Sequence, residues 1–293
     1  MEKVFIIAQH PGSKTDTVTE GLALARALDA APALVSYDYA YFAGDEYYNP
    51  RLAAAARQAL LEQRRQALVN KLAEQGESTL QPEARWSKTP HQDAIDASSS
   101  GGFSLLIKGI DDAEAPAPTD WHLIRHTRTP LMLLTNNPLA RGRCVLMAVD
   151  LDASSEDKQL LNQLVLAHGR RLAAALSLPL HLACVIRVPT ILRDMDLVTP
   201  HEILKAAHEK HSETLKSLGL PAEQIHLVTG EPELCLYQLS SSLKAKYLVL
   251  GARKREGLFG TVIGSTAEAL VHRVRCNLLI LPPDPQWLPD ERG

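Results

Sequence analysis

The chain contains one sequence pattern twice, and this internal repeat limits its fold more than any other feature. Three apolar runs recur in the same order, 3–8 as 143–148, 105–109 as 247–251, and 129–134 as 276–281. The offset between matching runs grows only from 140 to 147 residues, so the same elements recur with small loop insertions. Because solenoid repeats have periods of about 20–50 residues, this much longer period indicates a duplicated domain.

The boundary between the copies is predicted in a polar stretch that contains proline and glycine. Residues 136–142 have the sequence Asn-Asn-Pro-Leu-Ala-Arg-Gly, a composition typical of a short linker. We therefore expect two domains, at 1–138 and 139–293.

Each copy is predicted to be an α/β domain built on a parallel sheet. In the second copy the expected strands are five short apolar segments, at 144–149, 180–186, 225–229, 247–250 and 278–281. Strands that are apolar throughout and alternate with amphipathic helices indicate a parallel sheet covered on both faces. We expect two tandem Rossmann-like domains, each with five strands and four helices. One of these helices should run from Pro200 to near Gly219, and 251–264 should be a loop.

Composition excludes several classes of protein. The chain is 45% hydrophobic and 22% charged, which excludes a mostly disordered chain, and no apolar run approaches the ~18 residues of a membrane span. A net charge of -3 gives no general attraction to nucleic acid. Four widely separated cysteines without a C-x-x-C pair argue against a disulfide framework and a zinc site. They fit the reducing cytoplasm, where we expect the protein.

The strongest chemical candidate is the glycine-containing segment 251–266, which joins a predicted buried strand to a predicted helix. Glycine permits close approach of the backbone to a ligand, and the start of a helix offers unpaired N–H groups to a phosphate. Arg253 and Lys254 add positive charge. No Gly-Lys-Ser/Thr sequence closes the loop, so it is not a Walker A motif.

The same segment resembles the nucleotide-binding motif of the universal stress protein family. Nucleotide-binding members carry Gly, two residues, Gly, nine residues, Gly, and then Ser or Thr. Gly251, Gly264 and Ser265 have that spacing, and Lys254 stands at the middle glycine. Asp150 ends the first strand of this copy, where those members place an aspartate near the ribose and base.

The resemblance covers both copies. Gly230 and Pro232 resemble the family's turn after the third strand, and residues 118–125 resemble bacterial cytoplasmic members with two domains. The resemblance implies a stress-response role, a strand order of 3-2-1-4-5 in each domain, and binding of ATP with magnesium. It also implies that the last strands, 131–134 and 278–281, pair within one chain, and it is compatible with a homodimer.

We predict a small-molecule site at the carboxyl ends of strands 1 and 4 of the second copy, near the point where the strand order reverses. Asp150 is expected to accept hydrogen bonds from a ribose or another polar group, and Val185 and Leu250 to flank a base or apolar portion. The residues expected to face phosphate are Gly251, Arg253, Lys254, Gly264, Ser265 and Thr266.

The first copy lacks these features. Its equivalent loop, from Gly109 to Ala117, is shorter, contains Asp111, Asp112 and Glu114, and has no later glycine. Negative charge repels phosphate. His10 replaces the aspartate of the second copy, so we predict that the first copy does not hold ATP in this way.

The first copy has a concentration of aromatic residues after its second predicted strand. Tyr37, Tyr39, Tyr41 and Phe42 lie in this segment. Aromatic side chains of this kind pack connections and subunit contacts, and they also line pockets for apolar ligands. The alternative function is therefore the binding of an apolar or acyl-type ligand here.

No catalytic residue is predicted, because no nucleophile motif such as G-x-S-x-G is present. A slow nucleotide hydrolase is the enzymatic alternative, in which Asp150 and Glu256 would hold a metal ion and position water. His201, His208 and His211 share one face of a predicted helix. We predict that this face is solvated surface rather than a metal site.

Overall fold

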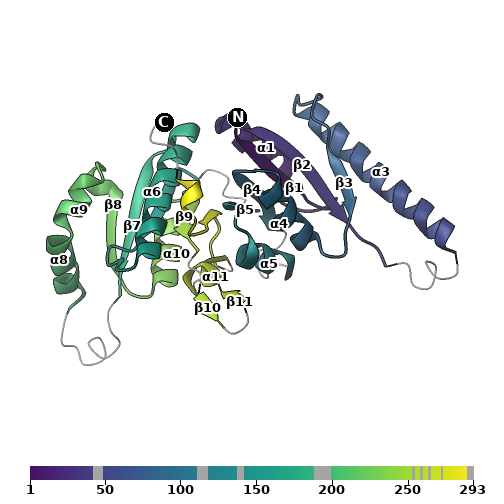
Figure 1. Cartoon of the computed structure of the whole chain (residues 1–293). Helices are drawn as coiled ribbons and strands as arrows, with labels where there is room; N and C mark the ends of the chain where they lie inside the picture. Colours follow the sequence, from purple (N-terminus) through teal and green to yellow (C-terminus); the bar gives the residue numbers. More distant parts are fainter. Residues whose placement is uncertain are drawn as a thin grey trace. The chain divides into compact units, whose positions relative to one another are not determined.

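The structure is a computed structural model that describes residues 1–41, 49–110, 118–136, 142–187, 199–252, 255–257, 260–262, 265–271 and 273–288. The chain divides into two compact units, shown in Figure 1. We call Met1–Asp112 with Pro116–Asn136 the first half, and Asn137–Gly293 the second half.

Five parallel strands form the sheet of the first half, in the order β3-β2-β1-β4-β5. The strands are β1 (Lys3–Ala8), β2 (Ala31–Asp38), β3 (Glu83–Trp86), β4 (Leu105–Ile110) and β5 (Leu131–Thr135). The described helices are α1 (Thr17–Ala27), α3 (Pro50–Glu74), α4 (Pro90–Ser100) and α5 (Pro118–His126). The first strand therefore lies in the middle of this sheet, as in the predicted order 3-2-1-4-5.

The second half repeats this arrangement, in the order β12-β9-β6-β7-β8. Its strands are β6 (Cys144–Val149), β7 (Leu180–Ile186), β8 (Ile225–Thr229), β9 (Ala245–Gly251) and β12 (Asn277–Leu281). Its helices are α6 (Glu156–Leu176), α8 (Pro200–Lys210), α9 (Ser212–Ser217), α10 (Pro232–Ser242) and α11 (Ser265–Val271), with short 3-10 turns η1 (Ala222–Gln224) and η2 (Pro285–Trp287).

Two details of the second half differ from the prediction. The expected helix from Pro200 to Gly219 is two helices, α8 and α9, which meet at His211, so the described part of this half has five α-helices instead of four. No proline or glycine lies at the break between the two helices. His211 is buried at this junction, and its side chain contacts Asp152, which belongs to neither helix. The expected loop also contains an antiparallel hairpin of β10 (Arg255–Gly257) and β11 (Gly260–Val262).

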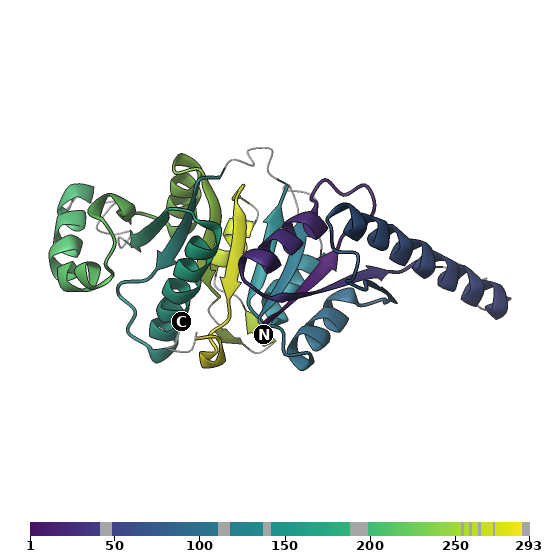
Figure 2. The same cartoon turned by 90° about the horizontal axis from the view of Figure 1, so that it is seen from above.

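Helices cover both faces of the strands in each half (Figures 1 and 2). In the first half, Lys71 Nζ of α3 lies 2.7 Å from Asp16 Oδ2 at the start of α1, and α4 packs beside α5. In the second half, the Arg170 guanidinium of α6 donates to the carbonyl of Leu218 after α9 at 2.6 Å, while α10 packs beside α11. The helix pairs on the two faces are thus the same in both halves.

The first helix of each half approaches its sheet closely at a glycine. A Cβ on Gly21 of α1 would lie 3.0 Å from Ile6 Cγ2 of β1, and a Cβ on Gly169 of α6 would collide with Met147 of β6. Larger side chains would push these helices away from the strands. This shared packing supports a common origin for the two halves.

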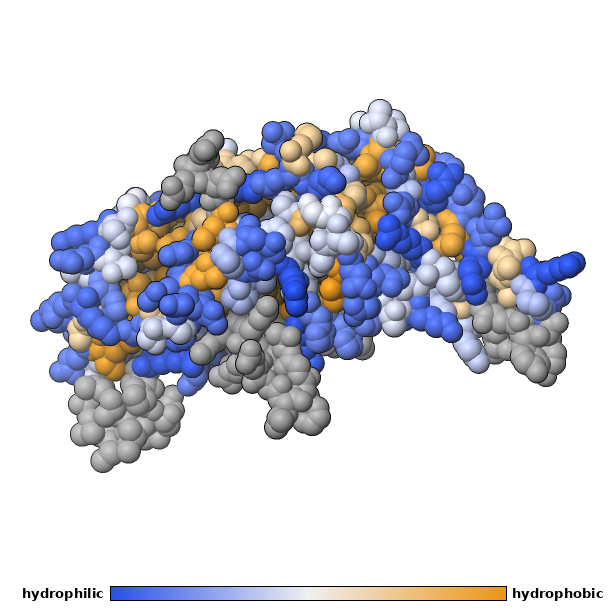
Figure 3. Space-filling model, viewed as in Figure 1, coloured by the Kyte–Doolittle hydropathy of each residue, from blue (hydrophilic) through white to orange (hydrophobic). Residues whose placement is uncertain are grey.

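Polar residues make up most of the face that Figure 3 draws, with apolar residues in separate patches among them. Within the described residues, none of the helices combines the length and the apolar character needed to cross a membrane.

Candidate functional site

A pocket of about 370 Å³ lies at the carboxyl ends of β6, β7 and β9 in the second half. Residues of α6, α10 and α11 complete its wall. The chain leaves β6 for β7 on one side, and β9 pairs with β6 on the other side. The pocket therefore lies where the strand order reverses, which is the usual ligand site of an open parallel sheet.

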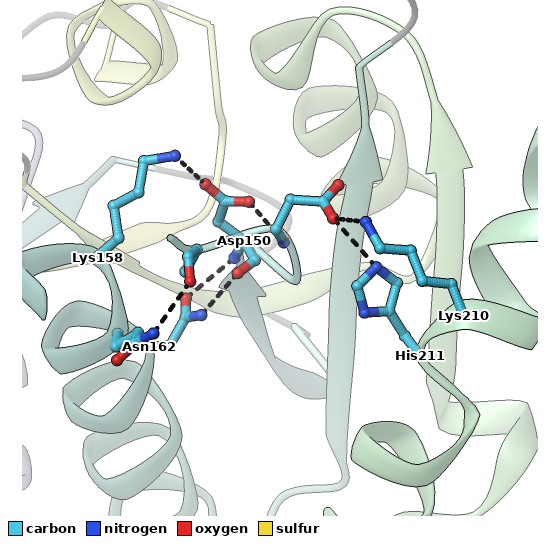
Figure 4. Close-up of polar contacts among 8 residues, drawn as sticks. Asp150, Lys158, Asn162, Lys210 and His211 are labelled. Atoms are coloured by element: carbon cyan, nitrogen blue, oxygen red, sulfur yellow. Dashed lines mark hydrogen bonds and ion pairs between the residues drawn. The ribbon is translucent and has the colours of Figure 1, made fainter. Parts of the chain in front are cut away.

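Asp150 follows β6 and is held at the pocket by its neighbours (Figure 4). Its backbone N–H donates to Asn162 Oδ1 at 3.0 Å, and Asn162 Nδ2 donates to its carbonyl at 2.7 Å. Its carboxylate accepts from Lys158 Nζ at 2.8 Å and from the Asp152 N–H at 3.1 Å. An ionised carboxylate has about four acceptor positions, so Asp150 retains capacity for a ligand.

Asp152 connects the pocket to the junction of α8 and α9. Its carboxylate pairs with Lys210, and His211 Nε2 lies 3.3 Å from Asp152 Oδ1. The hydrogen bond from Lys210 lowers the pKa of Asp152, although partial burial opposes this shift. Asp152 is therefore ionised at neutral pH and fastens the turn after β6 to the helix pair.

The structure brings together five of the residues predicted for the site. Asp150, Val185, Leu250, Gly251 and Thr266 all line the pocket. The remaining predicted residues are not placed: Arg253, Lys254 and Gly264 lie outside the described residues, and Ser265 begins α11 but its side chain is outside the described part.

Gly251 has a packing role that the sequence did not indicate. A Cβ at this position would lie 2.8 Å from Leu161 Cδ2 and 3.0 Å from Leu161 Cβ. A side chain here would therefore push α6 away from the end of β9. Leu161 also lines the pocket, so Gly251 sets the width of the pocket at this point.

Sequence reasoning missed several polar residues of the pocket, above all Lys158, Asn162 and Arg187. Two of them, Lys158 and Asn162, are four residues apart in the first turns of α6 and therefore share one face. A helix that follows a central strand begins at the carboxyl edge of the sheet. The first polar residues of this helix could therefore have been chosen from the sequence as candidate site residues. Arg187 directly follows β7, as Asp150 directly follows β6, so its position at the end of a predicted strand could have identified it.

The cysteines provide no reactive thiol at this site. Burial raises the pKa of Cys144 to about 11 and the pKa values of Cys184 and Cys276 to about 12. Partial burial, with Glu231 and Glu233 nearby, also raises the pKa of Cys235. A thiol reacts as its thiolate, so the raised pKa values make all four thiols less reactive, and the buried Cys144, Cys184 and Cys276 act as small core residues.

In the first half, the place that matches the β9 side of this pocket holds a buried ion pair. Lys108 of β4 pairs with Asp120 of α5, and Asp120 is only 1% exposed. In the repeat, these positions match Leu250 and Ala267 of the second half, which both line the pocket. His10, at the position of Asp150, is largely exposed and lies 3.5 Å from Asp38.

The predicted aromatic residues of the first half that the structure describes have different surroundings. Tyr39 lines a pocket of about 310 Å³ together with Trp86, whose ring centroid lies 5.7 Å away. Tyr37 is buried, and burial raises its pKa to about 12. Tyr41 is 78% exposed, and Phe42 lies outside the described residues.

Within the described part of the chain, no group of three or more His, Cys, Asp or Glu side chains is arranged to hold a metal ion. Of the three histidines considered for such a site, His201 and His208 are exposed on α8, whereas His211 is buried against Asp152.

Comparison with known proteins relates the chain to one family. Residues 143–282 match the model of the universal stress protein family. Universal stress protein E of Escherichia coli K12 is 28% identical over 218 residues, which cover 70% of this chain and 69% of the relative. A universal stress protein E homolog of Haemophilus influenzae is 25% identical over 222 residues, 71% of each chain.

Solved structures show the same fold over nearly the whole chain. A protein of unknown function from Pseudomonas aeruginosa PAO1 has a TM-score of 0.71 at 20% identity, covering 98% of this chain and 94% of that one. A universal stress protein from Archaeoglobus fulgidus DSM 4304 has a TM-score of 0.62 at 13% identity, and the match covers 96% of this chain and 98% of that one. Both halves therefore have the Rossmann-like α/β fold of these proteins, and residues 143–282 of the second half match the universal stress protein family.

Proposed function

We propose that the second half binds a small molecule without dedicated catalysis, and that an adenine nucleotide such as ATP with magnesium is the first candidate ligand. The observation that carries this proposal is the pocket of about 370 Å³ at the strand-order reversal. Its volume falls in the range of about 300–1,000 Å³ that ligand pockets occupy. We assign the site to a domain at 139–293, with a second domain of the same fold at 1–138.

The pocket has the two kinds of surface that a nucleoside needs. Val185, Leu236 and Leu250 supply apolar wall, against which a flat base can pack. Asp150 supplies a carboxylate whose remaining lone pairs can accept hydrogen bonds from ribose hydroxyl groups. The phosphate groups would then lie toward the segment from Gly251 to Thr266, as the family motif implies.

A thermal-shift titration with ATP and magnesium tests the nucleotide proposal. Ligand that binds only the folded chain stabilises it by about 1.4 kcal/mol when its concentration is ten times Kd, so the melting temperature should rise with ATP concentration. The rise should be smaller in Asp150→Ala. An unchanged melting temperature at millimolar ATP would reject the nucleotide and leave the pocket for another ligand.

The second candidate function is the binding of an apolar or acyl-type ligand in the first half. The pocket of about 310 Å³ beside Tyr39, Leu60 and Trp86 favours it. Arg64 and Asp38, 3.6 Å apart, add a polar pair to the same wall. Native mass spectrometry of the purified chain, followed by denaturing analysis of any adduct, distinguishes a co-purified apolar molecule from a nucleotide.

A slow nucleotide hydrolase is the enzymatic alternative. It needs a carboxylate to hold magnesium, and Asp150 is the candidate in the described pocket; the side chain of Glu256 lies outside the described part. Phosphate release from ATP would be measured for the purified chain and for Asp150→Ala. Release that the variant abolishes supports hydrolysis, whereas binding without release supports the non-catalytic proposal.

A further inference from the structure

The charges around the pocket of the second half do not cancel. Asp150 pairs with Lys158 at 2.8 Å, and Asp152 pairs with Lys210. Arg187 lines the same pocket, is exposed, and has no side-chain hydrogen bond or ion pair with any residue that the structure describes. Once these pairs are counted, Arg187 is the one charged group without an ionic partner among the described residues that line the pocket.

The backbone that carries Arg187 is held in place. Arg187 directly follows β7, which lies between β6 and β8 in the sheet. The carbonyl of the preceding Ile186 accepts a hydrogen bond from the N–H of Gly230 at 3.2 Å. Gly230 has a φ of 139°, which favours glycine, so this fixed turn holds the end of β7 at the pocket.

The surface next to Arg187 is apolar. Val185 precedes it by two residues, and Pro232 and Leu236 of α10 contribute to the same pocket. A guanidinium group has five N–H donors in a planar fork that matches carboxylate, sulfonate and phosphate oxygens. Beside apolar wall, such a group selects ligands in which one anionic group is attached to an apolar body.

We infer that Arg187 determines ligand specificity, and that the pocket of the second half takes a small molecule with an anionic group on an apolar or aromatic body. This inference rests on the proposed function of the pocket. It places the anion at the β7 side of β6, whereas the family motif implies phosphate at the β9 side, beyond Gly251. These two strands flank β6 on opposite sides.

Two fluorescent probes with the same ring system test the inference. The sulfonate 8-anilinonaphthalene-1-sulfonate is anionic, and N-phenyl-1-naphthylamine lacks the sulfonate. Binding of each would be measured for the wild type and for Arg187→Gln. Arg51→Gln, which removes an exposed arginine of the first half, is the matched control, and Thr266→Trp places a large side chain into the pocket.

The wild type should bind the sulfonate about tenfold more tightly than the amine, the size expected for one charge-assisted hydrogen bond. Arg187→Gln should remove this preference and leave the affinity for the amine unchanged, while Arg51→Gln should match the wild type. Equal affinities in the wild type, absence of sulfonate binding, or an unchanged preference in Arg187→Gln would overturn the inference.

The pocket-filling variant separates the inference from the function on which it rests. If Thr266→Trp abolishes binding of both probes while Arg187→Gln changes neither, the pocket binds ligands and the role of Arg187 is wrong. If Thr266→Trp leaves both affinities unchanged, the probes bind elsewhere, and both the inference and the assignment of the pocket are wrong.

Discussion

The two halves of the molecule share a strand order but differ at the carboxyl edge of the sheet. In the second half, Leu250 and Ala267 line an open pocket. In the first half, the matching positions hold Lys108 and Asp120, which form a buried ion pair. The difference shows that two side chains, one from the fourth strand and one from the last helix, can decide whether the end of the fourth strand lines a pocket or is filled by an ion pair.

The glycine that ends the fourth strand strengthens this comparison. A Cβ on Gly251 would meet the apolar side chain of Leu161, whereas a Cβ on Gly109 would meet the polar side chains of Thr17 and Gln9. Both halves therefore need glycine at this position for close packing. The side chains that this glycine packs against differ between the halves, and the apolar packing at Gly251 lies beside the pocket of the second half.

The largest expected effect comes from breaking the ion pair of the first half. Lys108→Met leaves Asp120 buried without its cation and should destabilise the chain by about 3–5 kcal/mol, as the removal of one partner of a buried pair does. Urea unfolding followed by circular dichroism measures the loss. The double variant Lys108→Leu with Asp120→Ala installs the residues of the second half and should recover most of the stability. A double variant no more stable than Lys108→Met would break the comparison.

A smaller loss of stability is expected when a side chain is added at Gly251, where β9 and α6 pack closely. Gly251→Ala forces Leu161 to move and should cost about 1–3 kcal/mol, the usual range for overpacking. The shift of α6 should also weaken ligand binding at the pocket. Thermal unfolding with and without ligand measures both effects. A variant as stable as the wild type, with unchanged binding, would show that α6 yields easily and that Gly251 does not set the pocket width.

Asp150→Ala should affect binding more than folding. The carboxylate of Asp150 is about half exposed, with 48% of the side chain accessible, and its main partner is Lys158, so the loss of stability should stay below about 1 kcal/mol. Affinity for a ligand with hydroxyl groups should fall about tenfold, the effect of one hydrogen bond to a charged group. His10→Ala, at the matching position of the first half, is the control and should leave the affinity unchanged.

The smallest expected effect is on the pH dependence of stability. His181 and His226 lie on neighbouring strands of the second half, with Nδ1 and Nε2 3.0 Å apart. Burial lowers the pKa values of both below the ordinary 6.5, and the nearby His181 lowers that of His226 further. Below pH 6.5 the unfolded chain therefore binds more protons at these two histidines than the folded chain does. The free energy of unfolding should fall progressively as the pH is lowered.

Melting temperatures between pH 7.5 and roughly pH 5 test this expectation. His226→Gln should melt with a weaker dependence on pH than the wild type. His201→Gln changes an exposed histidine on α8 and should keep the dependence of the wild type. An identical pH profile for His226→Gln and the wild type would assign the acid sensitivity to other groups, such as His91 of the first half, whose pKa is also lowered by burial.

The repeat and the apolar strands could be predicted from the sequence because they depend on local patterns. Strand β6 at Cys144–Val149 and strand β7 at Leu180–Ile186 have the expected bounds, since a strand buried on both faces is apolar throughout. The break between α8 and α9 could not be predicted in this way. It depends on the contact of His211 with Asp152, 59 residues away in the sequence.

The site could be predicted only in part, for a similar reason. Asp150 was found because it ends the first strand of the second copy, where nucleotide-binding universal stress proteins, which this copy resembles, have an aspartate. The role of Gly251 in packing against Leu161 was not found, because it depends on how closely α6 approaches β9. The ion pair of Lys108 and Asp120 was not predicted either. The sequence shows a lysine in an apolar strand, but its partner is known only once the position of α5 in the fold is known.

A calorimetric titration of the whole chain with ATP and magnesium tests most directly the claim that the second half alone provides the nucleotide pocket. The wild type should bind one ATP per chain, and Thr266→Trp, which fills the pocket of the second half, should abolish the heat of binding. A heat of binding that persists in Thr266→Trp, or a stoichiometry of two ATP per chain, would contradict the claim.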